Sequence, residues 1–306
     1  MESALLNKKF GIENKLTFKS IANGMTFMEV NTDQATASLS LMGGQVLTWH
    51  PKFQVQPVFW LSKLAHYLPG KAIRGGAPVC WPWFGSHSID NGLPGHGYAR
   101  LVPWKVISTS MDAAGVVDIE LKLEESNEEV SLRPIFWPKS VSLTAKFRIG
   151  EQLEISLTTK NLTNNIITLT EGLHTYFNIS DIRNIKISGL EDSLYVDLTD
   201  NNELHNQTGP ILFNQEVGRI FLDCKKTTVI EDTAYSREIF ILGSGSKSIA
   251  VWNPWFEKAS KISDIGSYGY LHMVCVETAN ALRNKVDIKT NESHTISARY
   301  IVRSSA

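Results

Sequence analysis

Residues 141–158, VSLTAKFRIGEQLEISLT, decide the fold class of this chain. Apolar side chains recur at every second position from Val141 to Phe147, with polar or charged residues between them. After Gly150 the same alternation resumes from Leu153 to Leu157. A period of two is typical of β-strands that bury one face and expose the other. The stretch therefore predicts two strands on the surface of a layered β-structure.

The same period extends outward along the chain. Residues 117–123, VDIELKL, alternate in the same way, and later short apolar runs are also typical of strands: 229–230, 239–242, 249–252, 273–276 and 296–302. Turn-forming residues separate them at 112–115, 200–202 and 243–245. Helical periodicity is weak, with candidates only at 256–262 and in a short turn near 61–68. Many short strands with few helices predict an all-β fold, a large antiparallel β-sandwich.

Neither repeats nor linkers divide the sequence. No self-similarity appears at a period of 20 to 50 residues, which argues against a propeller or solenoid. No stretch rich in proline, glycine or serine separates two regions. An acidic cluster at 124–129 is interpreted as a solvated hairpin tip. We therefore expect residues 1–306 to form a single domain.

Composition and charge narrow the function classes. The chain has 42% apolar and 20% charged residues and a formal net charge of −1. A net charge so close to zero gives no indication of a basic surface that would bind nucleic acid. No apolar stretch approaches the length of a membrane span, and residues 1–10 lack the apolar core of a secretory signal. The three cysteines, which are far apart, match neither a disulfide framework nor a metal motif. These features predict a cytoplasmic protein with no nucleic-acid or membrane partner.

Two segments in the first third of the chain carry residues that strand packing does not demand. The segment 74–85, RGGAPVCWPWFG, places an arginine beside aromatic rings, which suit the apolar face and anionic tail of a sugar phosphate. Its glycines let the backbone approach a ligand closely. The segment 93–100, LPGHGYAR, places His96 between glycines, and Arg100 offers a planar fork for phosphate or carboxylate. Taken singly, each segment also fits a buried aromatic turn or an exposed loop.

Two later segments add a possible acid and base. In 170–178, TEGLHTYFN, His174 follows an apolar strand and can exchange a proton near neutral pH. In 272–280, HMVCVETAN, Glu277 ends an apolar strand, where partial desolvation would raise its pKa and make it a better base. A structural histidine and a hydrogen-bonded carboxylate are the alternatives for each one alone.

The four segments, in this order, resemble the glucose-6-phosphate 1-epimerase branch (hexose-6-phosphate mutarotases) of the aldose 1-epimerase superfamily. The supporting pieces are GGQV at 43–46 and VWNP at 251–254, so the resemblance runs from about residue 40 to residue 280. It implies a large β-sandwich of the galactose-mutarotase type that needs no metal or organic cofactor. It also implies a small-molecule sugar phosphate as the substrate and a monomeric enzyme.

The resemblance also implies roles for five residues. The catalytic histidine and glutamate match His174 and Glu277, a second histidine lining the sugar site matches His96, and Arg74 and Arg100 match positions that hold the phosphate-bearing substrate. Opening a pyranose requires removal of the proton on the C1 hydroxyl and protonation of the ring oxygen. The residue types suit Glu277 as general base and His174 as general acid.

One position departs from the pattern of the resemblance. Related sequences carry aspartate where Gly218 stands, and that aspartate would contact the sugar. Its absence leaves the preferred sugar open, and either Asp223 or Asp232 is a candidate to compensate.

Three alternatives follow from the same residues. A glycosidase would use Glu171 and Glu277 as its two carboxylates. A non-catalytic sugar-binding module would need only Arg74, Arg100 and Trp81 or Trp83. A metal site is not expected, because no two of the eight histidines stand at ligand spacing on one element.

Overall fold

Strands dominate the architecture, as the alternating sequence predicts. A computed structural model describes residues 2–87, 90–123 and 132–304. The α-helices of this part are short: α1 (Glu2–Phe10) and α2 (Trp255–Ala259). The acidic cluster at 124–129 lies outside the described residues. No helix within the described ranges is long and apolar enough to cross a membrane.

One layer is an eight-stranded antiparallel sheet, here called the long sheet, with the order β13-β17-β18-β22-β9-β8-β7-β6. Its strands are β6 (Trp104–Met111), β7 (Val117–Leu123), β8 (Val141–Ile149), β9 (Leu153–Asn161), β13 (Lys186–Ser188), β17 (Thr228–Asp232), β18 (Arg237–Ser244) and β22 (Ser293–Ser304). Burial alternates along β8 and β9, which confirms the prediction from residues 141–158.

A second antiparallel sheet, here called the site sheet, has the order β15-β14-β16-β19-β20-β11-β5, and β12 also pairs with β20. Its strands are β5 (Val79–Cys80), β11 (Glu171–Leu173), β12 (Tyr176–Asn178), β14 (Leu194–Asp197), β15 (Glu203–Asn206), β16 (Val217–Leu222), β19 (Ser248–Asn253) and β20 (Met273–Asn280).

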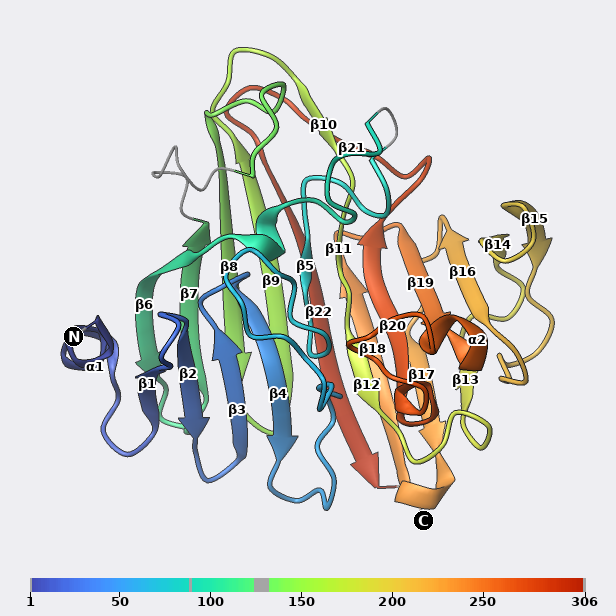
Figure 1. Cartoon of the computed structure of the whole chain (residues 1–306), viewed down its shortest axis with the longest axis horizontal. Helices are drawn as coiled ribbons and strands as arrows, with labels where there is room; N and C mark the ends of the chain where they lie inside the picture. Colours follow the sequence, from blue (N-terminus) through green and yellow to red (C-terminus); the bar gives the residue numbers. More distant parts are fainter. Residues whose placement is uncertain (1, 88–89, 124–131, 305–306) are drawn as a thin grey trace.

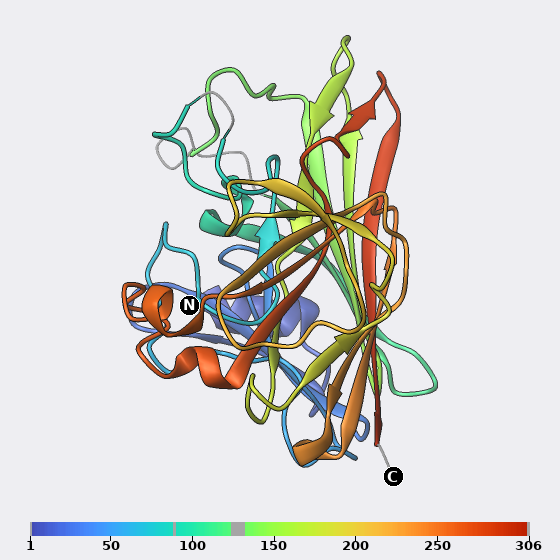
Figure 2. The ribbon, with the colours of Figure 1, turned by 90° about the vertical axis from the view of Figure 1, so that its right-hand side faces the viewer.

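The N-terminal sheet adds β1 (Leu16–Ser20), β2 (Thr26–Asn31), β3 (Ala35–Ser40) and β4 (Gln45–Pro51), and a separate pair joins β10 (Ile167–Leu169) to β21 (Val286–Ile288). Figures 1 and 2 show the N-terminal and site sheets covering one face of the long sheet. One hydrophobic cluster contains buried side chains from all three sheets. Within this cluster, the Phe59 ring makes edge-on contacts with Phe177 at 5.8 Å and Tyr300 at 5.2 Å between centroids. This layered packing confirms the predicted β-sandwich.

The helices match the sequence predictions only in part. The helix expected at 256–262 ends at Ala259, and residues 61–68 contain a turn but no helix. Helix α1 was not predicted, because its exposed surface gives little amphipathic pattern. It is held by Leu6 and Phe10 against the core and by the Asn7 side chain, which bonds both backbone groups of Phe18.

A break in strand pairing positions the later site residues. Strands β11 and β12 both pair with β20, at Glu171–Asn280 and at Tyr176–Cys275. Between them, the His174 backbone N–H donates instead to the carbonyl of Pro78. The His174 side chain therefore leaves the sheet beside the middle of β20, where Glu277 lies.

A close approach of two backbones positions the earlier residues. Gly97 has φ of +75°, and a Cβ built on it would lie 1.9 Å from the carbonyl oxygen of Trp81. Only glycine fits this contact, which fixes the turn carrying His96 against β5.

Candidate active site

A cavity of about 650 Å³ opens on the site sheet and is lined in part by residues of β16, β19 and β20. Figure 1 shows these three strands side by side, with α2 near them. Its lining includes all five residues singled out in the sequence: Arg74, His96, Arg100, His174 and Glu277. Segments that are distant in the chain thus meet at one site. The placement agrees with the sequence predictions for all five, while their chemical roles stay predictions.

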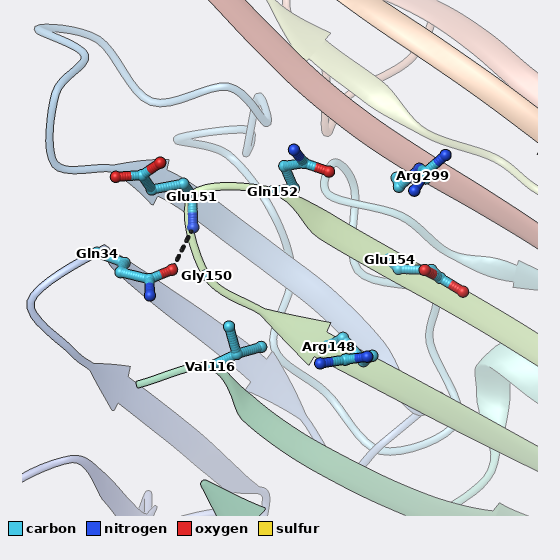
Figure 3. A pocket seen from close by; sticks show the side chains of 8 residues that line it. All are labelled: Gln34, Val116, Arg148, Gly150, Glu151, Gln152, Glu154 and Arg299. Atoms are coloured by element: carbon cyan, nitrogen blue, oxygen red, sulfur yellow. Dashed lines mark hydrogen bonds between the residues drawn. The ribbon is translucent and has the colours of Figure 1, made fainter. Parts of the chain in front are cut away.

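A second hollow, of about 320 Å³, lies over the hairpin that joins β8 to β9 (Figure 3). There the side-chain oxygen of Gln34 accepts a hydrogen bond from the Glu151 backbone, and Arg148 pairs with Asp112 and Asp118. No histidine or cysteine is among its described lining residues. Because none of its described lining residues holds a buried polar atom without a hydrogen-bond partner, the site-sheet cavity is the candidate for chemistry.

His174 and Glu277 form a buried pair at the bottom of the cavity. The imidazole Nε2 lies 3.5 Å from Glu277 Oε1, and the two residues are only 6% and 2% exposed. Glu277 Oε2 and His174 Nδ1 are buried without a hydrogen-bond partner among the described residues. Buried polar atoms are normally paired, so these two are available to a bound molecule.

Burial sets the protonation of this pair. Desolvation raises the pKa of Glu277 well above its usual value, with Arg100 acting in the opposite direction. Desolvation lowers the pKa of His174, and the neighbouring His96 and Arg100 lower it further. The 3.5 Å separation would also suit an ion pair, but both shifts favour the neutral forms. A carboxylic acid with a neutral imidazole holds the same number of protons as a carboxylate with an imidazolium, so the two states differ by one proton transfer.

The plane of His174 is fixed by aromatic contacts. Its ring stacks on Tyr176 with centroids 4.8 Å apart and an interplanar angle of 12°. The Tyr176 hydroxyl accepts a hydrogen bond of 2.9 Å from Arg74, whose Nε donates to Asp264 at 3.1 Å. Arg74 is therefore tethered by two partners and supports the ring under His174. Sequence reasoning missed Tyr176 and Asp264, because nothing in the local pattern links them.

His96 is a neutral hydrogen-bond donor. Its Nδ1 accepts from the Gly85 backbone N–H at 3.3 Å and lies 3.3 Å from the Cys80 sulfur. Burial, with Arg100 and Arg74, lowers the pKa of His96 to about 3. Because Nδ1 accepts, the single ring proton sits on Nε2. The predicted placement of this ring in a cleft is correct, and its edge meets His174 with centroids 5.1 Å apart.

Arg100 is the cavity cation that has no carboxylate partner among the described residues. The other three lining cations each have one: Arg74 with Asp264, Arg219 with Asp197 and Lys258 with Glu216. Arg100 donates from Nη2 to the carbonyl of Gly95 at 2.7 Å, and its Nε is buried without a partner. A guanidinium in this state suits an anionic ligand. Sequence reasoning missed Arg219 and Lys258, because no motif marks either one.

The aromatic lining agrees with the prediction only in part. Trp81 and Trp83 are 0% and 7% exposed, and their indole N–H groups donate to Thr159 and to the carbonyl of Pro94. Both rings belong to the core and neither lines the cavity, so neither supplies the sugar contact that the binding-module alternative assigns to Trp81 or Trp83. Phe84, from the same segment 74–85, lines the cavity, as does Trp252 of the sequence motif at 251–254.

The carboxylates proposed as substitutes also lie elsewhere. Gly218 lines the cavity, but Asp223 pairs with Arg283 at 2.7 Å, and Asp232 accepts from Ser180 at 2.8 Å. Neither aspartate lines the cavity, so the suggestion that one of them compensates for Gly218 is wrong.

Glu171 is likewise absent from the cavity lining. It is fully buried, and its Oε1 lies 3.1 Å from His294 Nε2. A glycosidase pair of Glu171 and Glu277 around one substrate is therefore not supported.

The family model for aldose 1-epimerase matches residues 27–300 of this chain. A protein of Escherichia coli K12, provisionally named a glucose-6-phosphate 1-epimerase, is 36% identical over 265 residues, which cover 87% of this chain and 86% of that protein. A protein of Salmonella typhimurium with the same provisional name is 34% identical over 82% of each chain.

A solved structure shows the same architecture. The crystal structure of a provisionally named mutarotase from Salmonella typhimurium superposes with a TM-score of 0.88 at 28% identity. The match covers 98% of this chain and 99% of that one. The sandwich predicted from strand periodicity is thus of the mutarotase type.

Proposed function

The chain belongs to the aldose 1-epimerase family, and from this premise we propose that it interconverts the α and β anomers of a hexose 6-phosphate, glucose 6-phosphate foremost. The observation that carries this proposal is the buried His174–Glu277 pair, whose Nδ1 and Oε2 atoms have no hydrogen-bond partner among the described residues. The same cavity also holds Arg100, which has no carboxylate partner within the described chain. A cavity that holds an acid, a base and an anion-binding guanidinium suits a phosphorylated aldose as substrate.

The proposed reaction moves one proton onto the enzyme and one off it. Glu277 takes the proton of the C1 hydroxyl while His174 gives a proton to the ring oxygen, so the C1–O5 bond breaks and an aldehyde forms. Rotation about C1–C2 presents the other face of the aldehyde. The ring then closes as O5 attacks C1, His174 recovers its proton, and Glu277 returns its proton to O1. Acid–base catalysis of this kind contributes about 10² to 10⁴ in rate.

The protonation states of the pair fit this cycle. Ring opening begins from carboxylate and imidazolium and ends at carboxylic acid and neutral imidazole. Burial favours the second state in the free protein, and the positive charge of Arg100 lowers the pKa of both residues. A phosphate bound to Arg100 would offset that charge and raise both pKa values, which favours the acid form of His174. The phosphate of the substrate would therefore favour the proton donor as well as the binding.

The remaining lining residues have supporting roles. His96 donates from Nε2 to a sugar oxygen, because its Nδ1 is occupied. Arg74 holds the stack under His174 and adds positive charge to the phosphate side. We further propose that the protein acts as a single copy, since every group named for the reaction comes from one chain. The three cysteines are free and buried, which supports a reducing, cytoplasmic location.

Proton NMR magnetisation exchange between the two anomers tests the proposal. The protein should accelerate exchange of glucose 6-phosphate far more than exchange of glucose or galactose. His174→Gln should lower that acceleration by about 10² or more while the protein still folds. Equal acceleration of glucose and its phosphate would refute the phosphate preference. No acceleration for any hexose phosphate, with binding still detectable, would favour the non-catalytic sugar-binding module.

A further inference from the structure

A thiol that the proposed reaction does not use lies beside the catalytic pair. Cys275 and Glu277 are two residues apart on β20, so their side chains emerge on the same face of the sheet. The Cys275 sulfur, one nitrogen of His174 and one carboxylate oxygen of Glu277 all lie within 4.8 Å of one another. All three residues are buried, and Cys275 has no exposed surface.

We propose that His174, Cys275 and Glu277 form a site for a thiophilic divalent cation, Zn²⁺ or Cd²⁺, whose binding blocks the acid–base pair and reversibly inhibits the protein. Binding of the cation does not depend on the proposed function; only the inhibition does.

The donor set favours such ions. Imidazole nitrogen, thiolate sulfur and carboxylate oxygen are the ligands of zinc in proteins, and soft sulfur selects zinc and its heavier relatives over magnesium or calcium. Ligand atoms around a tetrahedral zinc are about 3.3 to 3.6 Å apart, given bond lengths of about 2.0 to 2.3 Å. The 3.5 Å between His174 and Glu277 already fits, and the sulfur, within 4.8 Å of both, needs to approach by no more than about 1.5 Å.

Unpartnered atoms point to a ligand independently of the thiol. Glu277 Oε2 belongs to a residue that is 2% exposed, and it has no hydrogen-bond partner within the described chain. Both His174 and Glu277 also line the cavity, so a cation can reach them from solvent. The fourth coordination position then faces the cavity, where water completes the tetrahedron.

The charge balance permits a cation beside Arg74 and Arg100. Ligation uses the thiolate of Cys275 and the carboxylate of Glu277, whose two negative charges balance those of a divalent cation. The cluster with its bound ion is therefore neutral, and His174 contributes the lone pair of a neutral imidazole.

A neighbouring thiol offers a rival site. The Cys80 sulfur lies 3.3 Å from His96 Nδ1, which makes a second sulfur–imidazole contact near the cavity. The third cysteine, Cys224, is buried next to the hydroxyl of Ser193, with its sulfur 3.8 Å from that oxygen. Single substitutions of the three cysteines therefore separate the proposed site from its rival and from a matched control.

The experiment titrates the full chain, freed of metal with a chelator, with Cd²⁺ and follows the ultraviolet absorption of the cadmium–thiolate bond. Wild type, Cys80→Ser and Cys224→Ser should each bind one Cd²⁺ with this absorption, and Cys275→Ser should lose the absorption. Cys275→Ala tests the same point if the serine variant does not fold.

Inhibition is measured for each variant as the ratio of anomer exchange with and without Cd²⁺. Cd²⁺ should remove at least 90% of the anomer exchange of wild type and Cys224→Ser, and a chelator should restore it. The anomer exchange of Cys275→Ser should be the same with and without Cd²⁺. The proposal would be overturned if the cadmium–thiolate absorption persisted in Cys275→Ser or if it vanished in Cys80→Ser instead. It would also be overturned if the wild type bound no Cd²⁺. Loss of the absorption in Cys275→Ser, in a protein that exchanges no sugar, would support the metal site and reject the proposed function alone.

Discussion

Replacing Glu277 by glutamine separates catalysis from stability at one buried position. The substitution keeps the volume of the side chain and removes its ability to take a proton. A general base contributes about 10² to 10⁴ in rate. At 1.36 kcal/mol for each factor of ten, the loss corresponds to about 3 to 5 kcal/mol of transition-state stabilisation. Glu277→Gln should therefore lose nearly all anomer exchange of glucose 6-phosphate, with little change in binding.

The same substitution should stabilise the fold at neutral pH. Burial raises the pKa of Glu277 in the folded state above its unfolded value. The folded chain then holds more protons than the unfolded chain, so wild-type stability falls as pH rises above about 4.5 toward the raised pKa. This loss is at most about 1.4 kcal/mol per pH unit for one proton. Glutamine does not titrate, so the variant does not lose stability in this way as pH rises.

Thermal unfolding at pH 4.5 and at pH 7.5 measures this difference. The melting temperature of Glu277→Gln relative to wild type should be higher at pH 7.5 than at pH 4.5. The matched control is Glu171→Gln, which alters a fully buried carboxylate outside the cavity lining. It should lower stability, because His294 loses its carboxylate partner, and should retain turnover. A Glu277→Gln variant with substantial exchange, or with the same relative melting temperature at both pH values, would refute the reasoning.

Three further predictions test other contacts. Arg100→Ala should raise KM for glucose 6-phosphate about 10- to 100-fold, because a charge-assisted hydrogen bond is worth about 1.5 to 3 kcal/mol, and should change glucose kinetics much less; equal effects on both sugars would contradict a phosphate contact. The hydrogen bond with Glu171 raises the pKa of His294, so its stabilisation is complete below about pH 6.5 and disappears as pH rises through the raised value. His294→Gln should therefore be less stable than wild type in urea at pH 5.5 and closer to it at pH 9, and a gap independent of pH would count against this pair. Gly97→Ala should fail to fold, because its Cβ would lie 1.9 Å from a carbonyl oxygen, whereas Gly70→Ala, with φ of +73° and nothing within 4 Å, should remain folded; soluble expression and circular dichroism compare the two.

The sequence by itself determined the fold class and the identity of five cavity residues. Alternation at residues 141–158 requires strands with one buried face, because any other structure would expose half of those apolar side chains. The ordered motifs nominated His174 and Glu277, because their resemblance depends on residues that are close along the chain. The prediction of a single domain over residues 1–306 stays a prediction.

Only the tertiary structure decided how these residues meet. Arg74 pairs with Asp264 across 190 positions, a contact that depends on which strands become neighbours. The break between β11 and β12 places His174 next to Glu277 on β20, and strand register cannot be deduced from periodicity alone. Trp81 and Trp83 have the aromatic character that a sugar site favours, yet packing turns both into the core. The alternation of apolar residues along the chain determines which side chains must be buried. The pairing of strands that are distant in sequence determines which of the remaining side chains lie in the same cavity.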